Sequence, residues 1–125
     1  MLIAVYGSLR KDNYNHRYFD MGELKCRHYV SGRLYSLGAY PALSPDEDGD
    51  PVEVEVYDVS PETFYAINGM ELGAGYYSSI LPTPEGDATI WYMDEERFHD
   101  DEFVSVLKPE EDGFVRWPAD ERGRE

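Results

Sequence analysis

Val52-Glu53-Val54-Glu55-Val56-Tyr57 is the stretch that decides the fold, because valine and glutamate alternate through it without a break. Side chains on a β-strand point alternately to opposite faces, so this pattern predicts a strand with one buried face. The acidic, glycine-containing segment 46–50 lies just before it and is typical of a turn. We therefore expect a turn followed by a strand over residues 46–57.

Directly after this strand, Ser60-Pro61-Glu62 has the features of a helix N-terminus. The serine oxygen can cap free backbone amides, proline fits the first helical position, and glutamate complements the positive end of the helix dipole. Phe64 and Ile67 then give the helix a one-sided apolar face. Glu71 is expected at or just past the helix end, before the glycine-broken segment 73–75.

The rest of the chain consists of short β-type runs separated by turns. Residues 26–37 are rich in Tyr, Val and Leu and predict a long strand that bends at Gly32. The turn cluster 82–87 lies between two such runs and predicts an antiparallel hairpin. A short helix is expected over residues 15–23 and a loop over residues 38–42. The further predicted strands are residues 2–6, 76–81, 88–93 and 103–107.

These elements predict an α+β fold, a small closed or nearly closed mixed β-barrel with two short flanking helices. Closure suits a chain with many short strands because it removes exposed sheet edges. The mouth of such a barrel is also where a small ligand binds. With 125 residues, the chain is near the commonest domain size. We expect one domain over residues 1–118 and a frayed C-terminal tail over residues 119–125.

The charge balance argues against some classes of partner. The chain has 11 Lys and Arg residues against 26 Asp and Glu residues, a formal net charge of -15. Such a surface repels nucleic-acid phosphates and anionic membranes. The single cysteine, Cys26, cannot form an internal disulfide, and the apolar stretch 2–5 is too short for a signal-peptide core or a membrane span. We therefore expect a cytoplasmic protein that binds neither nucleic acid nor membranes.

The first candidate binding element is the turn after the N-terminal strand, Tyr6-Gly7-Ser8-Leu9. Glycine accepts unusual backbone dihedrals, so successive amides in such a turn can converge on one point. A carboxylate at that point gains several charge-assisted hydrogen bonds. The residues fit an anion-binding turn and an ordinary loop equally, and by themselves they leave both interpretations open.

The second candidate is Glu71, which is followed by two tyrosines, Tyr76 and Tyr77. Burial beside an apolar helix end raises the pKa of a carboxyl group toward neutral pH, as a general acid/base requires. However, the chain has 26 acidic residues, and most acidic side chains are solvated surface charges. Position alone therefore does not single out Glu71.

A set of motifs in a fixed order does single it out, by resemblance to a known family. The chain resembles the γ-glutamylcyclotransferase family, which includes AIG2-like and γ-glutamylamine cyclotransferase-like small proteins. The similarity covers about residues 1–93. The motifs that carry it are Tyr6-Gly7-Ser8-Leu9, Asn15-His16, residues 32–35 and 38–43, Val56-Tyr57-Asp58-Val59, and residues 67–77.

The resemblance implies a small β-barrel with a substrate cavity at its mouth, and neither a metal nor an organic cofactor. It also implies an enzyme that releases 5-oxoproline from a γ-glutamyl amine, amino acid or peptide by intramolecular acyl transfer. Glu71 falls at the position of the family's acid/base. The amides of Gly7, Ser8 and Leu9 would hold the substrate's carboxylate or a developing oxyanion. The further substrate-binding residues implied are Tyr6, Tyr40, Tyr77 and Tyr92.

Three positions depart from the family's common residues. Asn68 stands where Asp is common, Leu72 where Gly directly follows the acid/base, and Ser78 where Arg is common. These changes leave open a non-catalytic module that binds a small anion or metabolite on the same barrel, and an acidic interaction protein is a third hypothesis. Cys26 and His28 lie two residues apart but do not define a zinc site without further ligands. The leaving group and the oligomeric state do not follow from the sequence.

Overall fold

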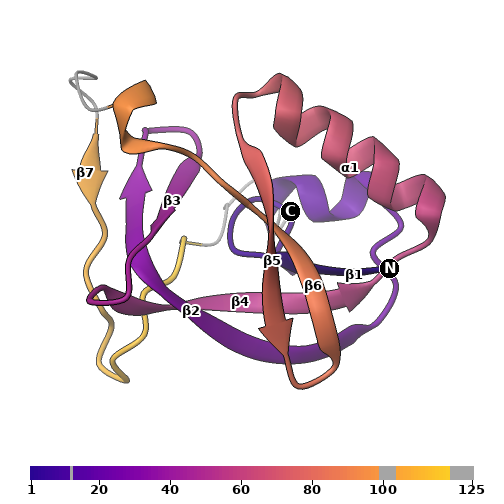
Figure 1. Cartoon of the computed structure of the whole chain (residues 1–125), viewed down its shortest axis with the longest axis horizontal. Coiled ribbons are helices and arrows are strands. Elements are labelled where there is room, and N and C mark those ends of the chain that lie inside the picture. The colour runs from indigo at the N-terminus through magenta and orange to yellow at the C-terminus, as the bar shows by residue number, and fades with distance from the viewer. Residues whose placement is uncertain (12, 99–103, 119–125) are drawn as a thin grey trace.

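The computed structural model describes residues 1–11, 13–98 and 104–118. One mixed sheet curls into a half-barrel, and the helix α1 packs beside it (Figure 1). Two short 3-10 helices, η1 and η2, lie in the connections between strands. In chain order the elements are β1 Leu2–Val5, η1 Tyr14–Tyr18, β2 Leu24–Ser36, β3 Pro41–Pro45, β4 Asp50–Asp58, α1 Pro61–Gly73, β5 Tyr77–Thr83, β6 Gly86–Tyr92, η2 Glu95–Arg97 and β7 Ser105–Val106.

The alternating stretch forms the centre of β4, where Val52, Val54 and Val56 are fully buried. β4 pairs antiparallel with β1 and with β2, whereas β1 pairs in parallel with β6. The strand order is β3-β2-β4-β1-β6-β5, and β7 pairs with β2. The predicted α+β fold with a mixed, nearly closed sheet is therefore confirmed, in the form of a half-barrel.

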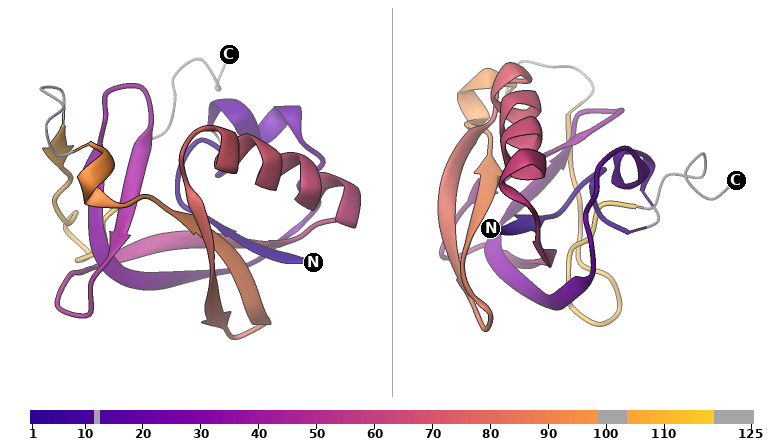
Figure 2. Two further views of the ribbon diagram at one scale, coloured as in Figure 1. Left: turned by 45° about the horizontal axis from the view of Figure 1, so that its top comes forward. Right: turned by 90° about the vertical axis from the view of Figure 1, so that its right-hand side faces the viewer.

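β1 is buried on both faces, which explains why its sequence is a continuous apolar run. Ala4 belongs to a core cluster that Val115, from the chain after β7, helps to cover. Ile3 and Val5 belong to a second cluster, which α1 covers with Ile67. The end of β1 therefore lies between two packed layers and beside the C-terminal part of α1 (Figure 2).

Two sequence-based expectations are wrong in type or length. The helix expected over residues 15–23 is the short 3-10 helix η1, and Met21 after it is buried in the second cluster. Tertiary burial of this side chain outweighs the weak helical preference of the segment. The loop expected over residues 38–42 ends at Tyr40, because Pro41 and Ala42 already pair with β2 in β3. A proline at the first residue of a strand is compatible with pairing.

The predicted hairpin is confirmed as the antiparallel pair β5 and β6. Its turn is tighter than expected, since pairing continues to Thr83 opposite Gly86. The strand expected over residues 103–107 is the short β7, and residue 103 lies outside the described residues. The expected tail, residues 119–125, also lies outside them. None of the helices in the described ranges is long and apolar enough to cross a membrane.

β2 changes its partner at Gly32, from β4 in its first part to β3 in its second part. A Cβ atom at Gly32 would lie 2.6 Å from the Ser44 carbonyl oxygen, and a Cβ at Gly49 would lie 2.5 Å from the Gly32 oxygen. Glycine is therefore required where these backbones meet. This change of partner brings β3 to the end of β1, where Pro41 packs against Gly7.

Replacing Gly32 with alanine should lower the free energy of unfolding by about 1–3 kcal/mol, because overpacking displaces backbone that cannot yield cheaply. The matched control is Gly69→Ala, at an exposed helical position where an added Cβ meets no atom within 4 Å. That variant should gain about 0.5–1 kcal/mol from helix propensity. Denaturant unfolding measures both changes. A Gly32→Ala protein as stable as the parent would contradict the close approach of β2 and β3.

Candidate functional site

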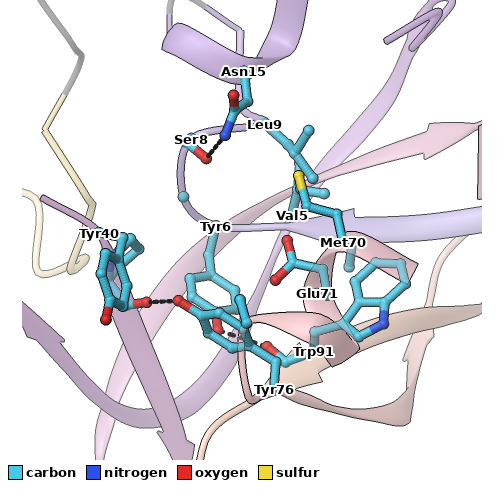
Figure 3. Close-up of a pocket in the computed structure, with 14 residues that line it drawn as sticks. Val5, Tyr6, Ser8, Leu9, Asn15, Tyr40, Met70, Glu71, Tyr76 and Trp91 are labelled. Carbon is cyan, nitrogen blue, oxygen red and sulfur yellow. Dashed lines mark hydrogen bonds between the residues drawn. The ribbon is translucent and has the colours of Figure 1, made fainter. Parts of the chain in front are cut away.

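A cavity of about 350 Å³ lies at the end of β1, between the turn that follows β1, the last turn of α1 and the start of β3 (Figure 3). Its wall combines apolar and aromatic side chains with the backbone of the turn. Glu71 is the one acidic side chain among the described residues that line it. The lining residues are Ala4, Val5, Tyr6, Gly7, Ser8, Leu9, Asn15, Tyr40, Pro41, Met70, Glu71, Ala74, Tyr76 and Trp91.

The turn of residues 7–10 is held through its carbonyl groups. Each carbonyl accepts one hydrogen bond: Gly7 from the Arg10 amide (3.0 Å), Ser8 from the Asn15 amide (2.9 Å), Leu9 from Nδ1 of His16 (2.8 Å) and Arg10 from the Asn13 amide (3.0 Å). By contrast, the amides of Gly7, Ser8 and Leu9 have no hydrogen-bond partner among the described residues. Three successive donors are therefore available in the wall of the cavity.

Asn15 of η1 holds Ser8 a second time, because its side-chain Nδ2 donates to Ser8 Oγ at 2.8 Å. The serine oxygen acts as an acceptor in this bond, so its own proton remains available to a ligand. The side chain of Ser8 can thus add a donor to those of the backbone. This side of the cavity is suited to an anion.

Glu71 lies in the last turn of α1, and its backbone carbonyl accepts the amides of Ala74 and Tyr76 as the helix ends. Its side chain lies between Tyr6 and Trp91, beneath the turn that carries Ser8 (Figure 3). Its carboxylate has no hydrogen bond or ion pair with any residue that the structure describes. Burial raises the pKa of this carboxyl from 4.5 to about 7. The group can therefore both take up and release a proton near neutral pH.

Two tyrosine hydroxyls complete the polar part of the cavity. Tyr6 donates its proton to the Trp91 carbonyl at 2.6 Å, and Tyr76 donates to the Pro41 carbonyl at 2.5 Å. Burial raises the pKa of both phenols above the usual value, so both stay protonated at neutral pH. Since their protons are already committed to the backbone, these oxygens can only accept hydrogen bonds from a ligand.

The cavity thus has a donor side, formed by the turn, and an acceptor side, formed by Glu71 with the oxygens of Tyr6 and Tyr76. No Lys, Arg or His is among the described residues that line it. A group that carries a carboxylate next to an ammonium matches this arrangement, with the carboxylate on the turn and the ammonium on the opposite side.

The structure brings most of the candidate site residues together. Glu71 shares the cavity with Tyr6, the turn residues Gly7, Ser8 and Leu9, and Tyr40, which is half-exposed at the rim. Tyr77 and Tyr92 are not among the lining residues. Tyr77 is exposed on β5, and its ring meets that of the buried Tyr92 edge to face, with centroids 5.9 Å apart.

The sequence analysis placed both Tyr76 and Tyr77 beside Glu71 but named only Tyr77 as a substrate-binding residue, and it did not point to Trp91. Adjacent residues at the start of a strand point to opposite faces, so only one of Tyr76 and Tyr77 can face the cavity. Gly75 directly precedes them with a φ of 99°, a conformation that favours glycine, and so sets the direction in which the backbone enters β5. This direction turns Tyr76 toward the cavity. Trp91 could have been found from β6, where it is the buried residue on the face opposite Ile90 and Tyr92.

The three departures from the common family residues lie outside the lining of the cavity. Asn68 accepts a hydrogen bond from the Trp91 indole at 2.9 Å and so holds this ring in the cavity wall. Leu72 is half-exposed on α1, and Ser78 is exposed on β5. None of the three side chains is therefore placed to contact a molecule in the cavity directly.

The sequence model of the family described as gamma-glutamyl cyclotransferase, AIG2-like, matches residues 3–107. The chain belongs to this family. No group of three or more His, Cys, Asp or Glu side chains that could hold a metal ion occurs in the described part of this family member.

Similar proteins come from archaea, bacteria and mammals. The chain is 37% identical over 89 residues to a Pyrococcus horikoshii protein named "Putative gamma-glutamylcyclotransferase PH0828", covering 71% of this chain and 75% of that protein. The crystal structure of that protein has a TM-score of 0.65 over 74% of this chain and 77% of its own. A Vibrio cholerae protein named "Putative gamma-glutamylcyclotransferase" is 34% identical over 102 residues, covering 78% of this chain and 87% of that protein. A mouse AIG2-like protein shares the fold, with a TM-score of 0.64 at 17% identity over 94% and 95% of the two chains.

The pKa of Glu71 makes this side chain a source of instability at high pH. Its folded pKa of about 7 lies above the ordinary value of 4.5, so the folded state binds more protons than the unfolded state between these pH values. Stability contributed by this group is therefore lost as pH rises from about 4.5 to 7. Glu71→Gln should unfold with a free energy up to about 3 kcal/mol higher than the parent at pH 8, and with a smaller gain at pH 5.5.

Denaturant unfolding at the two pH values measures this difference. Glu62→Gln, at an exposed position in the first turn of the same helix, is the control and should follow the pH dependence of the parent. Equal effects of Glu71→Gln at pH 5.5 and pH 8 would show that the Glu71 carboxyl is not desolvated.

Proposed function

We propose that this protein is a γ-glutamylcyclotransferase, which converts a γ-glutamyl compound into 5-oxoproline and a free amine, with Glu71 as general acid/base. In this reaction the α-amino nitrogen attacks the substrate's own γ-carbonyl carbon. A new C–N bond closes a five-membered ring, and the bond from the γ-carbon to the leaving nitrogen breaks. The observation that supports the proposal most is a poorly hydrated carboxyl group in the same cavity as three unpaired backbone amides.

The proposed binding mode follows from the two sides of the cavity. The α-carboxylate of the substrate accepts hydrogen bonds from the amides of Gly7, Ser8 and Leu9. The α-ammonium lies against the oxygens of Tyr6 and Tyr76 and the carboxylate of Glu71. Fixing both groups leaves the γ-carbonyl chain to fold back on the amine. Such orientation supplies much of the rate of an intramolecular reaction, with effective molarities of about 10⁵ M or more.

Glu71 then handles the protons. Its carboxylate takes a proton from the ammonium, which frees the nitrogen lone pair for attack. The resulting carboxylic acid gives this proton to the leaving nitrogen. The ring nitrogen still carries one proton too many after the attack, and the regenerated carboxylate takes it as the tetrahedral intermediate collapses. Glu71 passes this second proton to the released amine, so that the enzyme returns to its starting state. A pKa of about 7 suits both steps, because neither proton transfer is strongly uphill.

The charge of the site favours one kind of leaving group. No cationic side chain is found among the described lining residues, and the chain has a formal charge of -15. A leaving group that carries a carboxylate has no partner in the cavity and is repelled by the protein as a whole. We therefore infer that γ-glutamyl amines are better substrates than γ-glutamyl amino acids.

Replacing Glu71 with glutamine should lower kcat by about 10²–10⁴-fold, because glutamine cannot accept the proton. The measurement is the release of 5-oxoproline, with Glu62→Gln as the control that keeps full activity. In the parent, kcat/KM should rise with pH through about 7, as the base form of Glu71 is populated. Full activity of Glu71→Gln would exclude the mechanism. Calorimetric binding of γ-glutamyl compounds without any turnover would instead support the non-catalytic module.

The preference for the leaving group can be tested with γ-glutamyl-ethylamine and γ-glutamylalanine, which differ in one carboxylate. γ-Glutamyl-ethylamine should have a kcat/KM higher by about tenfold. This factor corresponds to a cost of about 1.4 kcal/mol for placing one unpaired carboxylate at the site. Added salt should reduce the difference, since it screens the repulsion. A higher kcat/KM for γ-glutamylalanine would contradict the inference.

A further inference from the structure

The turn of residues 7–10 has a second side, which faces a charged cavity of about 270 Å³. Gly7, Ser8 and Leu9 line the first cavity, whereas Arg10 and Lys11 line this second one. The same few residues therefore separate the candidate active site from a cluster of ion pairs. This arrangement allows the cluster to control the position of the amides without touching a substrate.

Glu55 is the buried centre of the cluster. It lies on β4 opposite Val5 of β1 and is only 2% exposed. Its Oε1 accepts the backbone amide of Lys11 at 2.7 Å and the hydroxyl of Tyr57 at 2.8 Å. Its Oε2 lies 3.7 Å from Nε of Arg10. A buried carboxylate is tolerated only with such partners, so its position is strongly fixed.

Arg10 extends the connection from the turn to the rest of the protein. Its side chain is 11% exposed, and Nη2 lies 3.6 Å from Glu53 of β4. Nη1 donates to the Trp117 carbonyl at 2.7 Å, in the chain segment after β7. The residue that directly follows the three free amides is thus bound both to β4 and to the C-terminal part of the described chain.

These contacts leave the turn few ways to move. Its carbonyls accept hydrogen bonds, its last side chain is ion-paired, and the next amide, that of Lys11, is bound by Glu55. The amides of Gly7, Ser8 and Leu9 are the groups of the turn that these contacts leave without a hydrogen-bond partner among the described residues. A binding site whose donors are held in place before the ligand arrives loses less entropy on binding.

We propose that Glu55, together with Arg10, is the positioning pair that holds the three amides in the geometry that binds a carboxylate. The identification of this carboxylate as the α-carboxylate of a γ-glutamyl compound rests on the function proposed above. Neither Glu55 nor Arg10 is among the described residues that line the cavity of Glu71. Loss of the pair therefore weakens binding of the carboxylate in the ground state and leaves the proton transfers intact.

The first test is kinetic. Glu55→Ala removes the acceptor of the Lys11 amide and the partner of Arg10, and should raise KM by at least about tenfold while kcat stays within about twofold. Glu55→Gln keeps an acceptor oxygen for the Lys11 amide but loses the charge that faces Arg10, so it should raise KM by a smaller factor than Glu55→Ala, and it keeps the test valid if Glu55→Ala does not fold. The pH dependence of kcat should be unchanged in both. Asp112→Asn is the control, because it removes a 2.6 Å ion pair to Arg116 in the same network but does not contact the turn. It should leave KM as in the parent.

The second test does not need turnover. Amide NMR of the ligand-free protein should show altered shifts and faster hydrogen exchange of Gly7, Ser8 and Leu9 in Glu55→Gln, and no change in Asp112→Asn. Such changes in a protein that has no activity on γ-glutamyl compounds would support the positioning pair and reject the proposed function. Unchanged amides in Glu55→Gln, or a fall in kcat with unchanged KM in Glu55→Ala, would overturn the positioning pair.

Discussion

The partial burial of one carboxyl group is the constraint on which the candidate site depends. Glu71 is polar and ionisable, yet no described residue offers it a hydrogen bond, and its burial raises its pKa to about 7. A folded protein tolerates such an unfavourable position only where packing elsewhere compensates for it. Here the compensation comes from the two apolar clusters on either side of β1, which fix the end of that strand beside the end of α1. The polar groups of the cavity then divide into donors on the turn and acceptors on the opposite side, and this division is what the proposed chemistry uses.

The architecture explains how distant parts of the chain meet at this place. β1 is central in the sheet, between β4 and β6, so the turn after it emerges from the most buried strand. β6 supplies Trp91, whose carbonyl accepts the hydroxyl of Tyr6 and whose indole is held by Asn68 of α1. β3 supplies Pro41, whose carbonyl accepts the hydroxyl of Tyr76. Each hydrogen bond that orients a tyrosine therefore also ties two elements of the half-barrel together, which links the stability of the fold to the shape of the site.

Local patterns predicted those parts of the structure that local forces determine. The alternation at residues 52–57 predicted the strand β4 with its buried valines, and the cap at Ser60 predicted the start of α1, where its side chain accepts the Thr63 amide. The family resemblance pointed to Glu71 and to the turn. What the sequence did not predict depends on contacts between distant residues. β3 begins within an expected loop because β2 offers a pairing edge after Gly32, and the choice of Tyr76 over Tyr77 depends on the backbone before β5. The burial of Glu55 was hidden because alternation predicts a solvated face, whereas Arg10 and Lys11 return to cover it.

The central claim is that the Glu71 carboxyl is poorly hydrated in the folded protein, and a direct titration tests it most simply. Carbon-13 NMR of protein labelled at the glutamate side-chain carboxyl, with the Glu71 signal assigned by its absence in Glu71→Gln, reports the ionisation of this one group. The account predicts a titration midpoint at about 7. A midpoint near 4.5, the ordinary value for a glutamate in water, would contradict it.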